Sequence, residues 1–196
     1  GAVHVEFDEH RAPETAREIV RMAIANYPNR GPVHIPDYHE PLVAGFSHEY
    51  LNYMQGGFHR GSFRPLNDAI IAGRVRGLAG VVGCNNVRVT QDEGIVEMIK
   101  RFIAQDVMVV VTGCAATAGA KAGYLSPEIL DSAGPGLREV MEAIGIPPVL
   151  HLGSCVDNSR ILTVLTQVAT EGGLGEDIDE LPAVGLCPEW MAEKAI

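Results

Sequence analysis

The sequence predicts an α/β fold in which a Rossmann-like parallel sheet is flanked by helices and carries cysteines at the carboxyl ends of its strands. Short, continuous apolar runs recur through the second half of the chain, as is typical of strands buried on both faces of a parallel sheet. Segments with apolar residues at helical spacing separate these runs. With 196 residues, of which 46% are hydrophobic, the chain can bury one good core.

Four apolar runs are the expected strands, and a cysteine follows each of them. The strands are expected within 79–83, 106–113, 147–154 and 181–186, and the cysteines are Cys84, Cys114, Cys155 and Cys187. Helices are expected between them at 91–105, 134–145 and 157–170. In the first helix, Ile95, Ile99 and Phe102 fall on one face, and Asp92 stands where a helix start favours an acidic residue. The repeating unit is therefore strand, cysteine turn, helix.

The first half of the chain follows this alternation more loosely. Strands are expected at 3–7 and 41–47, helices within 12–30 and 64–77, and a glycine- and aromatic-rich loop at 50–63. Pro13 suits the first turn of the earlier helix, which is expected to end before Pro28, and Gly73 suits the end of the later one. Because no linker or low-complexity stretch marks a boundary, residues 1–196 are expected to form a single domain.

Charge and composition exclude several classes of protein. The chain has 15 Lys and Arg against 25 Asp and Glu, a formal net charge of −10, which argues against a nucleic-acid partner. No apolar run is long enough for a membrane span, and the charged start is unlike a signal peptide, so a cytoplasmic location is expected. Four widely spaced cysteines without a CxxC pair argue against a disulfide framework and a zinc ribbon.

The cysteine turns are expected to meet at one edge of the sheet. Ligands of open parallel sheets bind beyond the carboxyl ends of the strands, where successive turns converge. Soft thiolates gathered at such an edge suit an iron-sulfur site better than an oxygen-loving metal. Spacing alone leaves open that these cysteines are small buried hydrophobic residues.

Four motifs carry a resemblance to a known family, and it is strongest from residue 79 onward. The motifs are VVGCNNVRVTQDEG (81–94), VVVTGCAATAGAKAG (109–123), LHLGSCVDNSRI (150–161) and PEWMAEKAI (188–196). Together they closely resemble the C-terminal half of the catalytic subunit of anaerobic nickel-iron carbon monoxide dehydrogenases, within the hybrid-cluster or prismane-type superfamily. GSCVDNSRI followed some thirty residues later by PEWMAEKAI is a specific pairing.

The resemblance implies a role for four residues. In that family the cysteines of the GCNN and TGC turns bind irons of a nickel-iron-sulfur cluster of 4Fe-4S type, which assigns Cys84 and Cys114 to iron. The cysteine of GSCVDN binds nickel, which assigns that metal to Cys155. The lysine of the PEWM segment lies beside the substrate and stabilises the oxygen of the developing CO2 unit, which assigns catalysis to Lys194. The resemblance gives Cys187 no ligand role.

The implied chemistry is the reversible oxidation of CO with water to CO2, two protons and two electrons. An electron carrier such as ferredoxin and a homodimeric parent protein are implied as well. Family members have further cluster ligands, a histidine and two cysteines, upstream of the segment that matches residue 1. The chain is therefore expected to be a piece of a longer multidomain enzyme, inactive by itself and with an absent or incomplete cluster.

Two alternatives remain at this point. A fragment of a hybrid-cluster protein, which would reduce nitrogen compounds, shares this architecture, although CVDNSR and PEWM disfavour it. A non-catalytic α/β module with structural or redox thiols is further away in class. Among other polar residues, Asp157, Asn158 and Arg160 are expected to hold the turn before a helix, and His151 is expected to be a hydrogen-bonded core residue.

Overall fold

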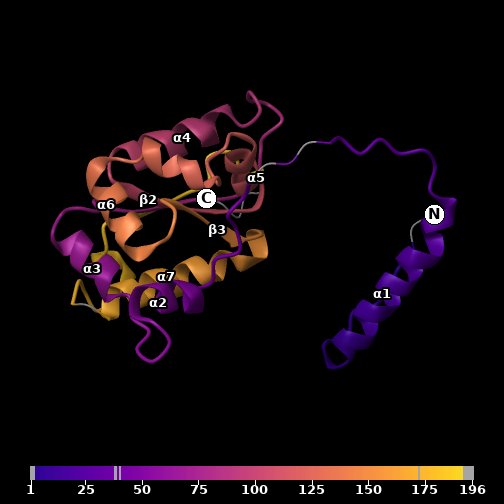
Figure 1. The fold of residues 1–196 in the computed structure, drawn as a ribbon, viewed down its shortest axis with the longest axis horizontal. Coiled ribbons are helices and arrows are strands. Elements are labelled where there is room, and N and C mark those ends of the chain that lie inside the picture. The colour runs from indigo at the N-terminus through magenta and orange to yellow at the C-terminus, as the bar shows by residue number, and fades with distance from the viewer. Residues whose placement is uncertain (1–2, 38, 40, 172, 192–196) are drawn as a thin grey trace. The chain divides into compact units, whose positions relative to one another are not determined.

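The computed structural model describes residues 3–37, 39, 41–171 and 173–191. It divides the chain into two compact units, Gly1–His39 and Glu40–Ile196, and each is described by itself (Figure 1). The expectation of a single domain within a longer enzyme stays a prediction. Among the described residues, no helix combines the length and the apolar character that crossing a membrane requires.

The first unit consists of one α-helix between two short 3-10 turns. Helix α1 spans Ala12–Asn26, between η1 (Glu9–Arg11) and η2 (Tyr27–Asn29), so the expected helix is confirmed, with a proline in its first turn. The strand expected at 3–7 is wrong, because these residues have no regular structure. No described residue of this unit is buried, and its described residues include no strand with which 3–7 could pair.

The second unit contains a four-stranded parallel sheet with the order β3-β2-β1-β4. The strands are β1 (Gly77–Val81), β2 (Val107–Thr112), β3 (Val149–Gly153) and β4 (Ala183–Leu186), which confirms the predicted fold class and all four strands of the second half. Val109, Val110 and Val111 of the central strand are at most 2% exposed, as the continuous apolar pattern predicts.

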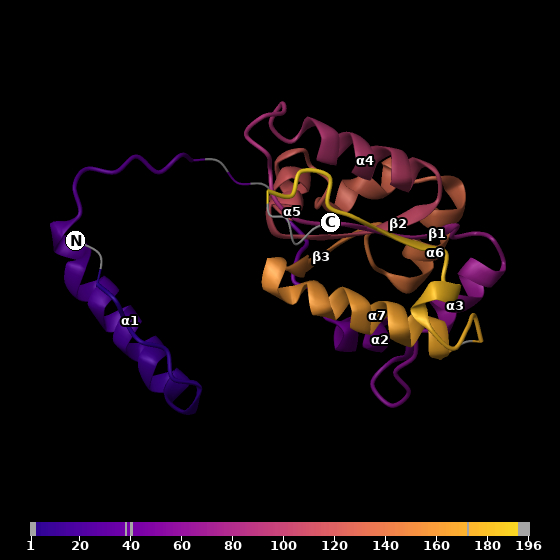
Figure 2. The same cartoon turned by 180° about the vertical axis from the view of Figure 1, so that it is seen from behind.

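Helices cover both faces of this sheet. They are α2 (His48–Gly56), α3 (Arg64–Ile71), α4 (Glu93–Ala104), α5 (Gly113–Lys121), α6 (Pro135–Ile144) and α7 (Asn158–Thr170), with 3-10 turns η3 (Pro127–Ser132), η4 (Cys155–Asp157) and η5 (Ile178–Glu180). Figures 1 and 2 show α4 and α5 on one face of the sheet and α2 and α7 on the other. The helices expected at 64–77, 91–105, 134–145 and 157–170 are thus confirmed.

Two expectations for the segment before α3 are wrong. Residues 41–47 form no strand; the backbone N–H groups of Gly45 and Phe46 both donate to the carbonyl of His151, at 3.2 and 3.0 Å, instead of forming a ladder. Gly45 has a φ of +85°, which takes the chain out of an extended conformation. The loop expected at 50–63 is helical as far as residue 56, because Ser47 caps α2 by accepting from the N–H of Tyr50 at 3.2 Å.

The strand order fixes where the sheet can offer a site. The chain runs from β1 outward to β2 and β3, and then returns to the opposite side of β1 to form β4. The direction of winding therefore reverses between β1 and β4, and such a reversal opens a crevice at the carboxyl ends of the strands. The turn that carries Cys84 lies directly after β1 at this reversal.

Candidate metal centre

Three cysteines lie at the carboxyl edge of the sheet, one after each of three adjacent strands. Cys84 follows β1 and is half-buried. Cys114 is the second residue of α5, directly after β2, and Cys155 begins η4 after β3; both are exposed. The edge of the sheet therefore presents three thiols from parts of the chain that are far apart in sequence.

Gly113 is the point where these turns meet. A Cβ atom at this position would collide with the Sγ of Cys155, and it would stand 3.5 Å from the carbonyl oxygen of Gly83. The N–H of Ala115 donates to the same Gly83 carbonyl at 3.1 Å. The backbone on either side of Cys84 and Cys114 and the sulfur of Cys155 thus share one small region.

The turn after β3 is held by a reciprocal cap. The carboxylate of Asp157 accepts from the backbone N–H and the hydroxyl of Ser154, at 2.9 and 3.1 Å, and from the Nε of Arg160 at 3.1 Å. The hydrogen bond from the Ser154 backbone, followed by that from Arg160, lowers the pKa of Asp157 below its ordinary value. The expectation that Asp157 and Arg160 hold this turn is confirmed, and Cys155 sits inside it.

Asn158 ties the turn after β3 to the end of β2. Its Oδ1 accepts a hydrogen bond of 2.6 Å from the hydroxyl of Thr112, which is fully buried. Thr112 immediately precedes Gly113, so this bond fixes the start of α5 relative to the start of α7. Asn158 therefore joins two cysteine turns, which goes beyond the capping expected of it.

The turn after β1 is held by Glu189, which sequence reasoning missed. This side chain is only 6% exposed, and its Oε2 accepts from the backbone N–H of Asn86 at 3.0 Å and from Nδ2 of Asn85 at 3.5 Å. The ring of Trp190 lies where a side chain at Gly83 would stand. The PEWM motif was the sequence signal that could have indicated these contacts, but no role was predicted for its glutamate and tryptophan.

The other sequence-predicted residues are less closely tied to this edge. Lys194 lies outside the described residues. Cys187 follows β4, as predicted, and its carbonyl accepts from the N–H of Trp190 at 3.3 Å. The expectation of a hydrogen-bonded ring at His151 is wrong, since its buried Nδ1 has no hydrogen-bond partner among the described residues.

The three thiols do not form a site for a single ion among the described residues. Among the described residues, no three His, Cys, Asp or Glu side chains gather closely enough to hold one ion. An iron-sulfur cluster is held by cysteine thiolates bound to different metal atoms, so its ligands stand farther apart. The absent side chain at Gly113 leaves room for the sulfur of Cys155, and the backbone of the turns that carry Cys84 and Cys114 meets at the same glycine.

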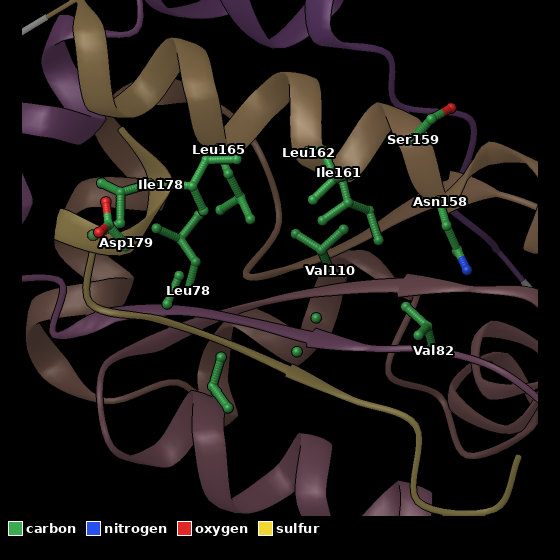
Figure 3. Close-up of a pocket in the computed structure, with 15 residues that line it drawn as sticks. Leu78, Val82, Val110, Asn158, Ser159, Ile161, Leu162, Leu165, Ile178 and Asp179 are labelled. Atoms are coloured by element: carbon green, nitrogen blue, oxygen red, sulfur yellow. The ribbon is translucent and has the colours of Figure 1, made fainter. Parts of the chain in front are cut away.

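A separate cavity of about 630 Å³ lies between α7 and the neighbouring face of β1 and β4 (Figure 3). Leu165 of α7 faces Leu78 of β1 across it, and Ile161 faces Val110 of β2. The described residues that line it include no cysteine or histidine, and Asp179 at one end is the single ionisable side chain among them. This cavity is therefore mainly apolar space beneath a helix, and it borders the thiol edge at Asn158.

Comparison with known proteins identifies the family. The family model described as "Prismane/CO dehydrogenase family" matches residues 1–196. The chain belongs to this family. Carbon monoxide dehydrogenase 1 of Methanosarcina mazei is 52% identical over 198 residues, and the carbon monoxide dehydrogenase of Rhodospirillum rubrum is 42% identical over 208 residues. Each alignment covers 100% of this chain but only 31% and 32% of those proteins, so the chain spans about a third of their length.

Solved structures of the Prismane/CO dehydrogenase family share the fold. Carbon monoxide dehydrogenase IV from Carboxydothermus hydrogenoformans matches with a TM-score of 0.83 and 42% identity, covering 100% of this chain and 32% of that one. A nickel-free carbon monoxide dehydrogenase from Thermococcus sp. AM4 matches with a TM-score of 0.82 and 49% identity, covering 100% and 30%. The resemblance stated from the motifs is confirmed, and these names favour carbon monoxide dehydrogenase over the hybrid-cluster protein.

Proposed function

We propose that this chain is the part of a carbon monoxide dehydrogenase that supplies three cysteine ligands and one lysine to a nickel-iron-sulfur site. The longer protein would catalyse CO + H2O to CO2, two protons and two electrons, reversibly. The observation that carries the proposal is the meeting of the turns after β1, β2 and β3 around Gly113, with the Cys155 sulfur against that glycine. Family membership supports the same reaction.

The three thiols have distinct proposed roles. Cys84 and Cys114 would each hold an iron, and Cys155 would hold nickel. The half-buried position of Cys84 suits an anchoring ligand, and the exposure of Cys155 suits a metal that a small molecule must reach. Cys114 is exposed as well, so its proposed iron role rests on its TGC turn. When bound, the cluster would supply the redox chemistry, the binding of CO and the activation of water.

Lys194 is the proposed electrostatic group. An ammonium beside the substrate stabilises negative charge that develops on the CO2 oxygen, and it can deliver or accept a proton there. The remaining proposals concern the whole protein: a cytoplasmic homodimer from an anaerobic organism that exchanges electrons with a carrier such as ferredoxin. We also propose that the present chain alone is inactive and lacks a complete cluster, because family members draw further ligands from upstream.

The decisive experiment replaces each thiol in the full-length protein. Cys84→Ser, Cys114→Ser and Cys155→Ser are compared with Cys187→Ser after anaerobic purification, with nickel and iron counted and CO oxidation assayed with an artificial electron acceptor. The first three variants are expected to lose metal and activity, whereas Cys187→Ser is expected to retain both. Full metal content and activity in the first three variants would contradict the ligand assignment.

Two further outcomes separate the alternatives. Absence of nickel and iron from the wild-type full-length protein would favour a non-catalytic α/β module with structural or redox thiols. Iron without nickel, together with reduction of a nitrogen compound, would favour a hybrid-cluster protein. CO oxidation by the isolated 196-residue chain would refute the proposal that this part is inactive alone.

A further inference from the structure

We propose that Glu189 is a positioning residue that locks the turn carrying Cys84 to the segment leading to Lys194. The inference rests on the proposed function for its catalytic consequence, whereas the lock itself is a feature of this chain. Glu189 stands five residues before Lys194 in the sequence and contacts the two residues that follow Cys84. Glu189 is proposed to contact neither the substrate nor a metal ligand. It would act through the turn that follows Cys84 and through the chain that leads to Lys194.

The first half of the lock is the buried carboxylate. A charged side chain that is 6% exposed is costly to bury unless its oxygens receive hydrogen bonds. Oε2 of Glu189 receives them from the Asn86 backbone at 3.0 Å and the Asn85 side chain at 3.5 Å. In turn, Oδ1 of Asn86 accepts from the N–H of Arg88 at 2.9 Å, which closes the turn on itself.

The other carboxylate oxygen faces the start of α4. Oε1 of Glu189 lies 3.4 Å from the point where a Cβ at Gly94 would stand, and Gly94 is the second residue of this 12-residue helix. A helix start carries a partial positive charge that favours a carboxylate, and the absent side chain leaves room for it. One carboxylate therefore hydrogen-bonds the Cys84 turn to the C-terminal segment and lies against the start of α4.

The second half of the lock is Trp190. Its ring fills the space beside Gly83, where a Cβ would come into collision with the six-membered ring. Gly83 has a φ of +100°, so glycine is favoured there on conformational grounds as well. The residues on both sides of Cys84 are therefore held. Glu189 contacts Asn85 and Asn86 after it, and Trp190 packs against Gly83 before it.

The lock has a direct consequence for the proposed catalysis. With Glu189 anchored to the cysteine turn, the chain that leads to Lys194 starts from a fixed point relative to a ligand. Loss of this anchor would free the start of the segment that leads to Lys194, and small misplacements of catalytic groups cost large factors in rate. Glu189 would therefore influence turnover more than substrate binding.

The lock can be tested without any metal, because Trp190 is the single tryptophan of the 196-residue chain. Its fluorescence is measured in wild type, Glu189→Ala, Glu189→Gln and the control Glu142→Ala, which removes an exposed carboxylate on α6. In Glu189→Ala we expect red-shifted emission and stronger acrylamide quenching, with unchanged far-UV circular dichroism. Glu189→Gln keeps an oxygen that accepts from Asn86 and is expected to restore most of the wild-type signal.

The same variants in the full-length enzyme test the positioning role. Per nickel bound, Glu189→Ala is expected to lower kcat by about tenfold or more with KM for CO changed less than twofold, and Glu189→Gln to recover most of kcat. Unchanged Trp190 fluorescence in Glu189→Ala would overturn the lock. An unchanged kcat per nickel in Glu189→Ala would overturn the positioning role. An inactive wild-type enzyme would instead contradict the proposed function.

Discussion

The buried hydroxyl of Thr112 donates a 2.6 Å hydrogen bond to Oδ1 of Asn158, and so joins the end of β2 to the first residue of α7. Thr112→Val would keep the side-chain shape but leave the amide oxygen of Asn158 without its donor. We expect a loss of about 1–3 kcal/mol in the free energy of unfolding, measured by urea denaturation. Thr90→Val, at an exposed position, is the control and should change stability by less than about 0.5 kcal/mol.

Gly113→Ala adds only a methyl group, but we expect it to disturb the edge of the sheet that carries the cysteines. The backbone at Gly113 has a φ of +60°, which alanine adopts at a cost of about 1–2 kcal/mol, and the new methyl group meets the Cys155 sulfur. We therefore expect lower stability and faster labelling of Cys155 by a thiol reagent, because its sulfur is pushed outward. Gly185→Ala meets no atom within 4 Å and serves as the control; equal labelling in both variants would contradict the contact.

Ionisation of the Tyr124 phenol is expected to lower the stability of the fold at alkaline pH. Burial, and then the nearby charge of Glu97, raises the pKa of its phenol above the ordinary value. The neutral phenol therefore contributes stability that is fully present below about pH 10 and is lost as the pH rises through the higher folded pKa. Urea midpoints measured from pH 8 to 11 should fall less steeply in Tyr124→Phe than in wild type. Tyr53→Phe, at an exposed position, should follow the wild-type curve.

We expect the buried side chains of α4, on the face that packs on the sheet, to contribute more to the free energy of unfolding than exposed side chains do. Ile99 is completely buried, so Ile99→Ala removes apolar contacts and leaves a cavity, with an expected loss of about 2–5 kcal/mol. Ile71→Ala, at a side chain that is 59% exposed, should cost less than about 1 kcal/mol. Chemical denaturation of both variants by circular dichroism gives the comparison, and similar losses would contradict the assigned burial.

The strands of the second half could be predicted because burial on both faces leaves a continuous apolar run. Val109, Val110 and Val111 give that signal without ambiguity. Residues 3–7 are also rich in apolar residues, but the described residues of their own unit include no second strand, and strand formation depends on partners that a local pattern does not contain. Helix α2 was missed because the glycines and aromatics of residues 50–63 are typical of a loop, although Ser47 supplies the cap of the helix.

The candidate site could be predicted only where its residues share a repeated pattern. Cys84, Cys114 and Cys155 each follow a strand, so the topology of a parallel sheet brings them to one edge. The buried carboxylate of Glu189 and the bond between Thr112 and Asn158 depend on side-chain contacts between distant segments. Such contacts have no periodicity in the sequence, which is why they emerge only from the structure.

Separate strand-helix units carry the three cysteines, with Cys114 standing 30 positions after Cys84 and Cys155 standing 41 positions after Cys114. A nascent polypeptide thus has no short loop with which to capture metal while it leaves the ribosome, in contrast to a local CxxC pair. If the proposed cluster binds at this edge, we expect the sheet to assemble first and the inorganic components to be inserted afterwards, because folding alone brings the three turns together.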